Sequence, residues 1–218
     1  MSQQEEGLRS LPGNRAPETR IILASASPRR KKILEDLGLD FKVMEPDVSL
    51  KEATSGDPVR IAIKNSILKA ENMSGSIGSE EEIRYLISGF DTIVYLGKRI
   101  LGKPADSLEA SMYIEALSGR THRVVTGVCI IDSFTGRKLI GSEISEVRFR
   151  KLTRDEISRY LAAEYVLDKA GAYNIAGPGA LLVEKVKGCL FNIIGVPVFK
   201  YIGFLRKLDY KILHHSKE

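Results

Sequence analysis

Near its beginning, the chain places a short apolar run, a hydroxyl-rich turn and a basic helix start in direct succession. Residues 21–24 are Ile-Ile-Leu-Ala, which is typical of a buried strand, and the helical pattern over 31–37 ends at Gly38. Between them, Ser27 suits a helix N-cap and Pro28 suits the first helical position. This strand–turn–helix unit is the firmest constraint that the sequence places on the fold.

The first turn of this helix carries two arginines, Arg29 and Arg30. Free N–H groups already make a helix N-terminus positive, so cations are disfavoured there. A local rule that is broken at a strand-to-helix junction suggests a functional site. An external anion would meet backbone N–H groups, the hydroxyls of Ser25 and Ser27, and both guanidinium groups. The segment therefore predicts a phosphate-binding loop, with an ordinary exposed turn as the alternative.

Strands and helices continue to alternate along the chain, with several hairpins. Strands are expected at 41–44, 85–95, 122–132, 138–150 and 180–186, and helices from Pro58 and at 108–117, 154–163 and 198–208. The stretch 85–95 fits either one long strand or a strand pair, and 73–79 is expected to be a loop. This alternation predicts a mixed, twisted α/β sheet. We expect a flexible extension over residues 1–20, a single domain over 21–210 and a frayed tail over 211–218.

Charge and cysteine content restrict the function classes. The net charge of +5 and the sequence pI near 9.1 suit an anionic partner, without separating nucleic acid from a small phosphate ester. Cys129 and Cys189 lack metal-ligand spacing and lie in apolar surroundings, so we expect buried free thiols in a reducing compartment. No stretch has the length of a membrane span, and the polar start lacks a secretory signal. A cytoplasmic protein without membrane contact is predicted.

Two further polar clusters stand out: Asp91 with Lys103, and Asp168 with Lys169. Together with the arginine loop they supply cations for phosphates and carboxylates for a divalent metal or for activating water. That combination fits phosphoryl chemistry, in which positioning and charge neutralisation provide most of the catalysis. As alternatives, the second pair could be a surface ion pair and Lys103 an ordinary turn residue. A Ser-His-Asp set is excluded, because His122 is the only histidine outside the tail.

Six short motifs between Ile21 and Leu205 occur in an order that is typical of one family. They are Ala24–Arg30, Asp91–Val94, Leu101–Pro104, Ser118–Gly127, Asp168–Tyr173 and Gly195–Pro197. On these motifs the chain resembles the Maf family of nucleoside triphosphate pyrophosphatases, also described as septum formation inhibitor Maf-like proteins. The resemblance covers nearly the whole chain.

The resemblance implies a fold, a reaction and a cofactor. The expected fold is a mixed α/β fold of Maf or inosine triphosphatase-like type, with a strongly curved sheet, flanking helices and two lobes around a central cleft. The expected reaction splits a nucleoside triphosphate between the α- and β-phosphates, giving a monophosphate and pyrophosphate. A divalent metal cation, Mg²⁺ or Mn²⁺, is expected, and a homodimer is possible by analogy.

The resemblance also implies roles for the catalytic residues. Asp91 matches the catalytic carboxylate, as general base on water or as metal ligand, and Lys103 matches a lysine that contacts phosphate. A further catalytic lysine is assigned to Lys69, with Lys64 as the alternative. A metal-binding glutamate maps poorly here: Glu52 is the nearest candidate, and Asp47 the next.

The remaining assignments concern the phosphates, the metal and the base. The phosphate-binding residues are Ser25, Arg29, Arg30 and Lys169, and the metal-binding residues are Asp91, Glu52 and Asp168. Thr92, Asn174 and Ala176 are assigned to base specificity.

Ala176 departs from the family pattern. Members that are selective for thymidine and uridine triphosphates carry a glutamine at this position. An alanine cannot make the hydrogen bonds of an amide, and a site built around such bonds loses discrimination without them. A relaxed base preference is therefore predicted, unless Asn174 supplies a compensating amide.

Two other function classes remain open. A nucleic-acid-binding module would suit the basic pI, but it is disfavoured by the lack of tryptophan, of an aromatic stacking pattern and of a dense basic stripe. A nucleotide-sensing regulator of cell division is the second alternative. The presence of Asp91 favours an enzyme over a pure binder.

Overall fold

The computed structural model describes residues 17–47, 52–77 and 83–212 of the 218-residue chain. Most of the predicted extension over 1–20 lies outside the described residues, as does the tail from 213 onward. The first strand, β1, spans Glu18–Ala24 and so begins three residues before the predicted start. Within the described ranges, no helix combines the length and the apolar character needed to cross a bilayer.

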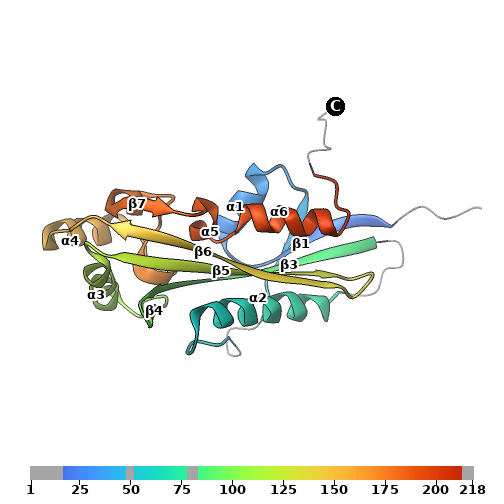
Figure 1. Cartoon of the computed structure of the whole chain (residues 1–218), viewed down its shortest axis with the longest axis horizontal. Coiled ribbons are helices and arrows are strands. Elements are labelled where there is room, and N and C mark those ends of the chain that lie inside the picture. The colour runs from blue at the N-terminus through green and yellow to red at the C-terminus, as the bar shows by residue number, and fades with distance from the viewer. Residues whose placement is uncertain (1–16, 48–51, 78–82, 213–218) are drawn as a thin grey trace, which may run out of the picture.

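A mixed sheet forms the centre of the molecule, in the order β2-β1-β3-β5-β6-β7, with β4 paired to β3. After β1, the strands are β2 Phe41–Met44, β3 Ile83–Leu96, β4 Arg99–Leu101, β5 Thr121–Asp132, β6 Lys138–Phe149 and β7 Val183–Lys187. Strand β1 pairs in parallel with β2 and β3, and the pairs from β3 to β7 are antiparallel. The predicted mixed α/β class is confirmed. The stretch 85–95 belongs to one long strand (Figure 1).

Helices cover both faces of the parallel end of the sheet, and α3 and α4 lie at its other end (Figure 1). The bounds of the α-helices are α1 Pro28–Asp36, α2 Pro58–Ser74, α3 Ser107–Leu117, α4 Arg154–Ala163, α5 Leu190–Ile194 and α6 Val198–Lys207. Helix α2 lies on one face, and α1 and α6 lie on the other (Figure 1). In β1, Ile21 and Leu23 pack into the core under α1 and α6, whereas Ile22 and Ala24 pack under α2. This alternation explains why all four residues of the run are apolar.

A separate core fills the other end of the sheet. It joins α3 and α4 to the ends of β3, β5 and β6, and its buried members include Val94, Ile114, Val124 and Phe149. The long strands β3 and β5 run through both cores. Residues from both ends of the sheet line the central cleft, as the predicted two-lobed architecture requires.

Capping residues set most of the helix starts where the sequence predicts them. The Asp57 carboxylate accepts from the backbone N–H of Arg60 at 2.9 Å, and Asp106 caps α3 in the same way. Thr153 and Glu156 form a reciprocal capping box at α4. Ser27 does precede α1, but its side chain makes no cap hydrogen bond.

Three local expectations are wrong. The strand predicted over 180–186 is only β7, because a 3₁₀ turn, η3 Pro178–Leu182, occupies its first part. Gly179 packs so closely on the backbone of Asn174 that the chain turns there. Helix α2 continues to Ser74, into the predicted loop. Cys129 is buried and free as expected, but Cys189 is only half-buried.

Candidate active site

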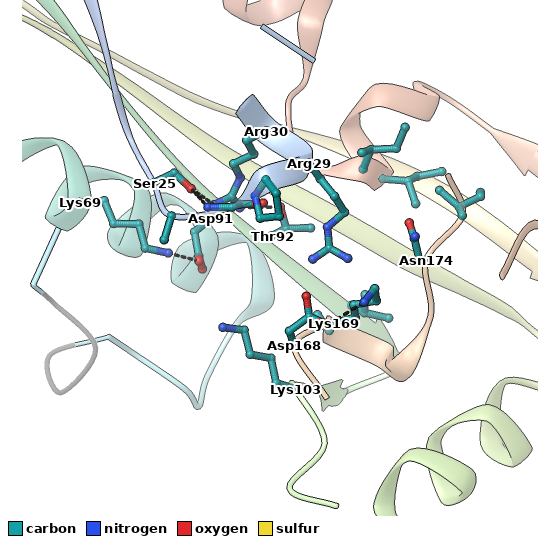
Figure 2. Close-up of a pocket in the computed structure, with 18 of the residues that line it drawn as sticks. Ser25, Arg29, Arg30, Lys69, Asp91, Thr92, Lys103, Asp168, Lys169 and Asn174 are labelled. Atoms are coloured by element: carbon teal, nitrogen blue, oxygen red, sulfur yellow. Dashed lines mark hydrogen bonds and ion pairs between the residues drawn. The ribbon is translucent and has the colours of Figure 1, made fainter. Parts of the chain in front are cut away.

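A cavity of about 450 Å³ opens between the two cores (Figure 2). Every residue assigned to the site from the sequence lines it except Ala176, which is exposed and lies outside the lining. The lining residues among them are Ser25, Arg29, Arg30, Glu52, Lys69, Asp91, Thr92, Lys103, Asp168, Lys169 and Asn174. The alternatives Lys64 and Asp47 are exposed and are not part of the lining.

Ser25 is the first residue after β1, and its hydroxyl already accepts two hydrogen bonds. The Ser25 Oγ accepts from the backbone N–H of Ser27 at 3.1 Å and from Nη1 of Arg30 at 3.2 Å. Both of its lone pairs are used, so its O–H proton is the part left for another partner. A hydroxyl in that state can donate to a phosphate oxygen in the cavity.

Arg30 is held rigidly inside the protein. Its guanidinium donates to the carbonyl of Gly195 at 3.1 Å, to Ser25, and to Oγ1 of Thr92 at 3.0 Å. Burial lowers the pKa of Arg30 to about 10, although the negative charges of Asp91 and Glu52 act in the opposite direction. One N–H on each Nη atom remains for a ligand, so Arg30 presents a fixed positive charge beside the cavity.

Arg29 and Lys103 differ from Arg30 because nothing in the described part of the chain anchors them. Neither forms a hydrogen bond or ion pair with the described part of the chain, and both line the cavity. Arg29 is half-buried and Lys103 is exposed. Figure 2 shows both side chains extending into the cavity from opposite sides. These two cations are free to bind an anionic ligand.

Asp91 lies near the middle of β3 and is 8% exposed. Its Oδ1 receives the ammonium of Lys69 at 2.6 Å, and its Oδ2 receives Nδ2 of Asn65 at 3.0 Å. The same ammonium lies 2.7 Å from Oε1 of Glu52. Lys69 therefore joins two carboxylates, and Asn65 fixes the plane of the one on β3. This places Lys69 and Glu52, not Lys64 and Asp47, beside the carboxylate.

Sequence reasoning missed Asn65, which is 3% exposed and also pairs with the backbone of Ala53. A mid-helix asparagine resembles a surface residue. Its spacing from Lys69 could have identified it, because Asn65 precedes Lys69 by four residues and residues four apart share one face of a helix.

Two strand glycines let α2 approach Asp91. A Cβ on Gly89 would lie 2.2 Å from the carbonyl oxygen of Ser66, and a Cβ on Gly127 would lie 2.2 Å from that of Ala62. The helix backbone thus lies directly on β3 and β5. This close contact brings the two α2 side chains, Asn65 and Lys69, within hydrogen-bonding distance of the strand carboxylate.

The opposite wall carries Asp168 and Lys169. Lys169 is 8% exposed, and its ammonium binds Asp168 at 2.7 Å, Glu164 at 3.5 Å and the carbonyl of Tyr165. The two residues do form an ion pair, but not the surface pair considered above, because the lysine is buried. Burial alone would raise the pKa of Asp168, but the hydrogen bond and charge of Lys169 and the charge of Arg29 lower it overall.

Apolar side chains and one amide line the remaining end of the cavity. The amide of Asn174 is engaged within its own loop: its Oδ1 accepts from the N–H of Ala176 at 3.2 Å, and its Nδ2 donates to Glu164 at 3.3 Å. Thr92, which was assigned to base specificity, lines the cavity and accepts a hydrogen bond from Arg30 of α1. The apolar lining consists of Val94, Ile175, Ile193 and Ile194.

His122 lies behind this wall, and sequence reasoning gave it no role beyond a motif. It is 1% exposed, and its Nε2 lies 2.9 Å from the hydroxyl of Tyr173, a lining residue. Burial lowers the pKa of His122 to about 4, so the ring is neutral near pH 7. Neighbouring rings pack edge-on against it, with Phe149 at 5.0 Å between centroids.

The carboxylates suit a divalent cation only in part. Among the described residues, no group of three or more histidine, cysteine, aspartate or glutamate side chains could hold a metal. Asp91 and Glu52 nevertheless approach one cation, the ammonium of Lys69, from two sides. Mg²⁺ is commonly held by one or two carboxylates, with substrate phosphates completing its coordination. The donor set fits a metal of that kind.

Comparison with known proteins gives a consistent result. A family model described as Maf-like protein matches residues 20–208. The chain is 41% identical over 186 residues to a dTTP/UTP pyrophosphatase of Alkaliphilus oremlandii, covering 85% of this chain and 94% of that protein. It is 39% identical over 196 residues to a dTTP/UTP pyrophosphatase of Dictyoglomus thermophilum, covering 88% and 98%.

Among solved structures, the Ham1 protein of Staphylococcus aureus aligns with a TM-score of 0.38 and 12% identity. The alignment covers 60% of this chain and 71% of that one. A likeness at this level supports no argument about fold or function.

Proposed function

Because the chain belongs to the Maf family, we propose that it is a nucleoside triphosphate pyrophosphatase that releases nucleoside monophosphate and pyrophosphate. The names of the curated relatives support this reaction class. The observation that carries the proposal in this molecule is the setting of Asp91: a carboxylate oriented by Lys69 and Asn65 at the edge of a cavity with several cations.

In this proposal the triphosphate lies across the cationic part of the cavity. Arg29 and Lys103 close on the phosphates, because they have no partner in the described part of the chain. Arg30 and the Ser25 O–H contribute fixed donors from the loop before α1. Charge that develops on the leaving pyrophosphate is then neutralised by groups that are already in place.

Asp91 acts as the general base on the attacking water. Lys69 and Asn65 hold its two oxygens in one orientation, which positions it for attack on the α-phosphorus. Asp91 and Glu52 are also the residues that would hold Mg²⁺ or Mn²⁺, whereas Asp168, on the facing wall, does not group with them as a third ligand. When bound, the metal supplies charge neutralisation at the phosphate oxygens. Lys169 supports the facing wall through its bonds to Asp168 and Glu164 rather than contacting phosphate in the state described.

The base is proposed to lie against the apolar end of the cavity with little edge recognition. Asn174 uses its amide within its own loop, and Ala176 is exposed away from the lining. A wall formed by isoleucine side chains accepts several bases, because apolar contact does not read hydrogen-bonding edges. We therefore expect a preference that is broader than thymidine and uridine.

The test is pyrophosphate release from a panel of ribo- and deoxynucleoside triphosphates, with Mg²⁺, with Mn²⁺ and with chelator. We expect metal-dependent release from pyrimidine and purine substrates alike. Strict selectivity for thymidine and uridine triphosphates would reject the broad preference while keeping the reaction. Binding of nucleotide by folded protein without release would instead favour a nucleotide-sensing regulator.

Asp91→Asn should lower turnover about 100-fold or more, since the amide cannot accept the proton of water. Asp36→Asn is the matched control, because Asp36 lies at the far end of α1 and its one ion pair among the described residues is with Lys32 on the surface. The Tm of both variants should lie within a few degrees of the wild-type Tm. Full turnover in folded D91N would contradict the general-base role. A cytoplasmic location and a homodimer remain predictions that fractionation and sedimentation would test.

A further inference from the structure

A line of hydrogen bonds leads from Arg30 into the protein, away from the cavity. Nη2 of Arg30 donates to Oγ1 of Thr92 at 3.0 Å. Oγ1 of Thr92 lies 3.0 Å from Oγ1 of Thr126, its direct neighbour on β5 in the strand register. Oγ1 of Thr126 donates to the carbonyl of Asn192 in α5 at 2.8 Å. Thr126 is fully buried and does not line the cavity.

The number of hydroxyl protons determines which group donates and which accepts in each of these hydrogen bonds. A threonine hydroxyl carries a single proton, and that of Thr126 is used on the Asn192 carbonyl. Thr126 must therefore accept from Thr92, which in turn accepts from Arg30. Each hydroxyl is oriented by the next, and such chains strengthen one another. The acceptor at the far end is a main-chain carbonyl that cannot rotate.

The carbonyl at the far end is itself fixed. The side chain of Asn192 is fully buried, and its Nδ2 donates to the carbonyl of Val124 at 3.1 Å and to Oγ of Ser145 at 2.9 Å. These bonds tie α5 to β5 and β6. The Gly195 carbonyl, one residue past the end of α5, holds Nε of Arg30. The guanidinium is thus connected to the α5 region in two ways, directly through the Gly195 carbonyl and indirectly through the two threonine hydroxyls.

We propose that Thr126 is a positioning residue for the reaction, which orients the Arg30 guanidinium through Thr92. The inference rests on the proposed function, since it assumes that Arg30 faces the phosphates. Without the Thr126 oxygen, the Thr92 proton loses its acceptor, and the hydroxyl rotates to find another. The lone pair of Thr92 Oγ1 that accepts from Nη2 of Arg30 then turns away. The guanidinium thereby loses one of its three hydrogen-bond acceptors.

The kinetic test compares Thr126→Val with Thr126→Ser. Valine matches the shape of threonine without the hydroxyl, whereas serine keeps the hydroxyl and loses a methyl group. We expect kcat/KM for nucleoside triphosphate to fall roughly 10- to 100-fold in T126V and to stay within about 2-fold of wild type in T126S. An equal loss in both variants would indicate core packing and overturn the proposal.

A double-mutant cycle separates action through Arg30 from a general structural effect. Lysine at position 30 cannot form the forked bonds to Thr92, Ser25 and Gly195. If Thr126 acts through the guanidinium, T126V should change kcat/KM by less than about 2-fold in an Arg30→Lys background. A loss in that background as large as in the wild type would overturn the proposal.

Two further readouts do not need turnover, so they separate this proposal from the reaction itself. In ¹⁵N NMR spectra, the Arg30 side-chain signals, assigned by their absence in R30K, should be resolved in wild type and T126S and averaged in T126V. Inorganic pyrophosphate should bind roughly 10-fold more weakly to T126V by calorimetry. If wild type releases no pyrophosphate from any nucleotide, these measurements still decide the role of Thr126. Unchanged Arg30 signals would overturn it.

If T126V does not fold, Thr92→Val and Thr92→Ser repeat the comparison one bond closer to Arg30. The valine variant should show the averaged Arg30 signals and the weaker pyrophosphate binding, and the serine variant neither. Equal behaviour of the two would overturn the proposal.

Discussion

At the scale of single residues, the cations of the cavity differ in how much freedom they keep. Lys69 and Lys169 are each shared between two carboxylates, and Arg30 is anchored to three oxygens. Arg29 and Lys103 have no such partners among the described residues. The anchored groups can shape the site before a ligand arrives, whereas the free ones can follow it. We expect losses at the free pair to fall mainly on ligand affinity.

The burial of His122 predicts how the free energy of unfolding depends on pH. Burial lowers its pKa to about 4, whereas a histidine in an unfolded chain titrates near 6.5. Between these values the unfolded chain binds a proton that the folded chain does not. The contribution of His122 to stability is therefore complete above about pH 6.5 and is lost as the pH falls toward 4, by about 3 kcal/mol in all.

The comparison to make is wild type against His122→Gln, whose amide can pair with Tyr173 but does not titrate. Urea unfolding at pH 6.5 and 4.5 should show wild type losing about 2–3 kcal/mol more than the variant on acidification. Other titrating groups are common to both proteins and cancel in the difference. Equal losses would mean that His122 is protonated in the folded state.

The sequence singled out residues that the structure places around one cavity where their chemistry breaks a local rule. Arg29 and Arg30 attract notice because cations are disfavoured at a helix start, and Asp91 because it interrupts an apolar strand. Asn65 and His122 break no such rule: an asparagine in a helix and a histidine in a strand are both ordinary. Their importance comes from what lies opposite them, which depends on tertiary contacts that a single sequence does not contain.

At the scale of elements, the position of α2 decides the geometry around Asp91. Its backbone contacts β3 at Gly89 and β5 at Gly127 with no space for a side chain. Any increase in that separation would move Asn65 and Lys69 away from the carboxylate together. The site therefore depends on two glycines that never touch the cavity.

Gly127→Ala tests this dependence. The new Cβ would lie 2.2 Å from the Ala62 carbonyl, so either the helix or the strand must move. We expect a loss of about 3 kcal/mol in the free energy of unfolding, together with lower turnover from the displaced Lys69. Urea unfolding and pyrophosphate release measure the two effects.

Gly203→Ala in α6 is the control, because nothing lies within 4 Å of its Cβ position. Alanine in a helix interior should raise stability by about 0.5–1 kcal/mol and leave turnover unchanged. A G127A protein as stable and active as wild type would show that α2 is held less tightly than its contacts suggest.

The helix and strand boundaries were predicted correctly where a capping residue marks them and incorrectly where no such residue is present. Asp57, Asp106 and Thr153 carry the start signal in their own side chains, so three helices begin as predicted. The segment 180–182 has apolar residues typical of a strand, yet it forms η3, because Gly179 packs on the backbone of Asn174. That contact joins two parts of the loop before β7, and residue preference alone does not reveal it.

At the scale of the whole molecule, the cavity joins two cores that have the long strands β3, β5 and β6 and helix α5 in common. Ser25, Arg29 and Arg30 belong to the side of α1, whereas Lys103, Asp168 and Lys169 belong to the side of α3 and α4. A triphosphate that contacts both sides would connect them. Ligand binding should then stabilise the molecule as a unit, and the phosphates should be responsible.

Thermal unfolding of the D91N variant, which should bind without turnover, measures this effect. At a nucleotide concentration about 100 times its Kd, binding adds about 2.7 kcal/mol to the free energy of unfolding. For a chain of this size that corresponds to a rise in Tm of about 5–10 °C. The matching nucleoside, which contacts only the apolar end, should produce almost no rise.

Removing the two free cations should abolish most of the stabilisation that a bound triphosphate provides by contacting both sides of the cavity. Arg29→Ala and Lys103→Ala, each made in the D91N background, take away one contact from opposite walls of the cavity. Each should reduce the rise in Tm, and together they should remove most of it, because charge-assisted contacts to phosphate supply the binding energy. Chelation of the metal should reduce the rise further if Asp91 is not essential for holding it. A nucleoside that stabilises as strongly as its triphosphate would contradict this account and place the binding energy in the base.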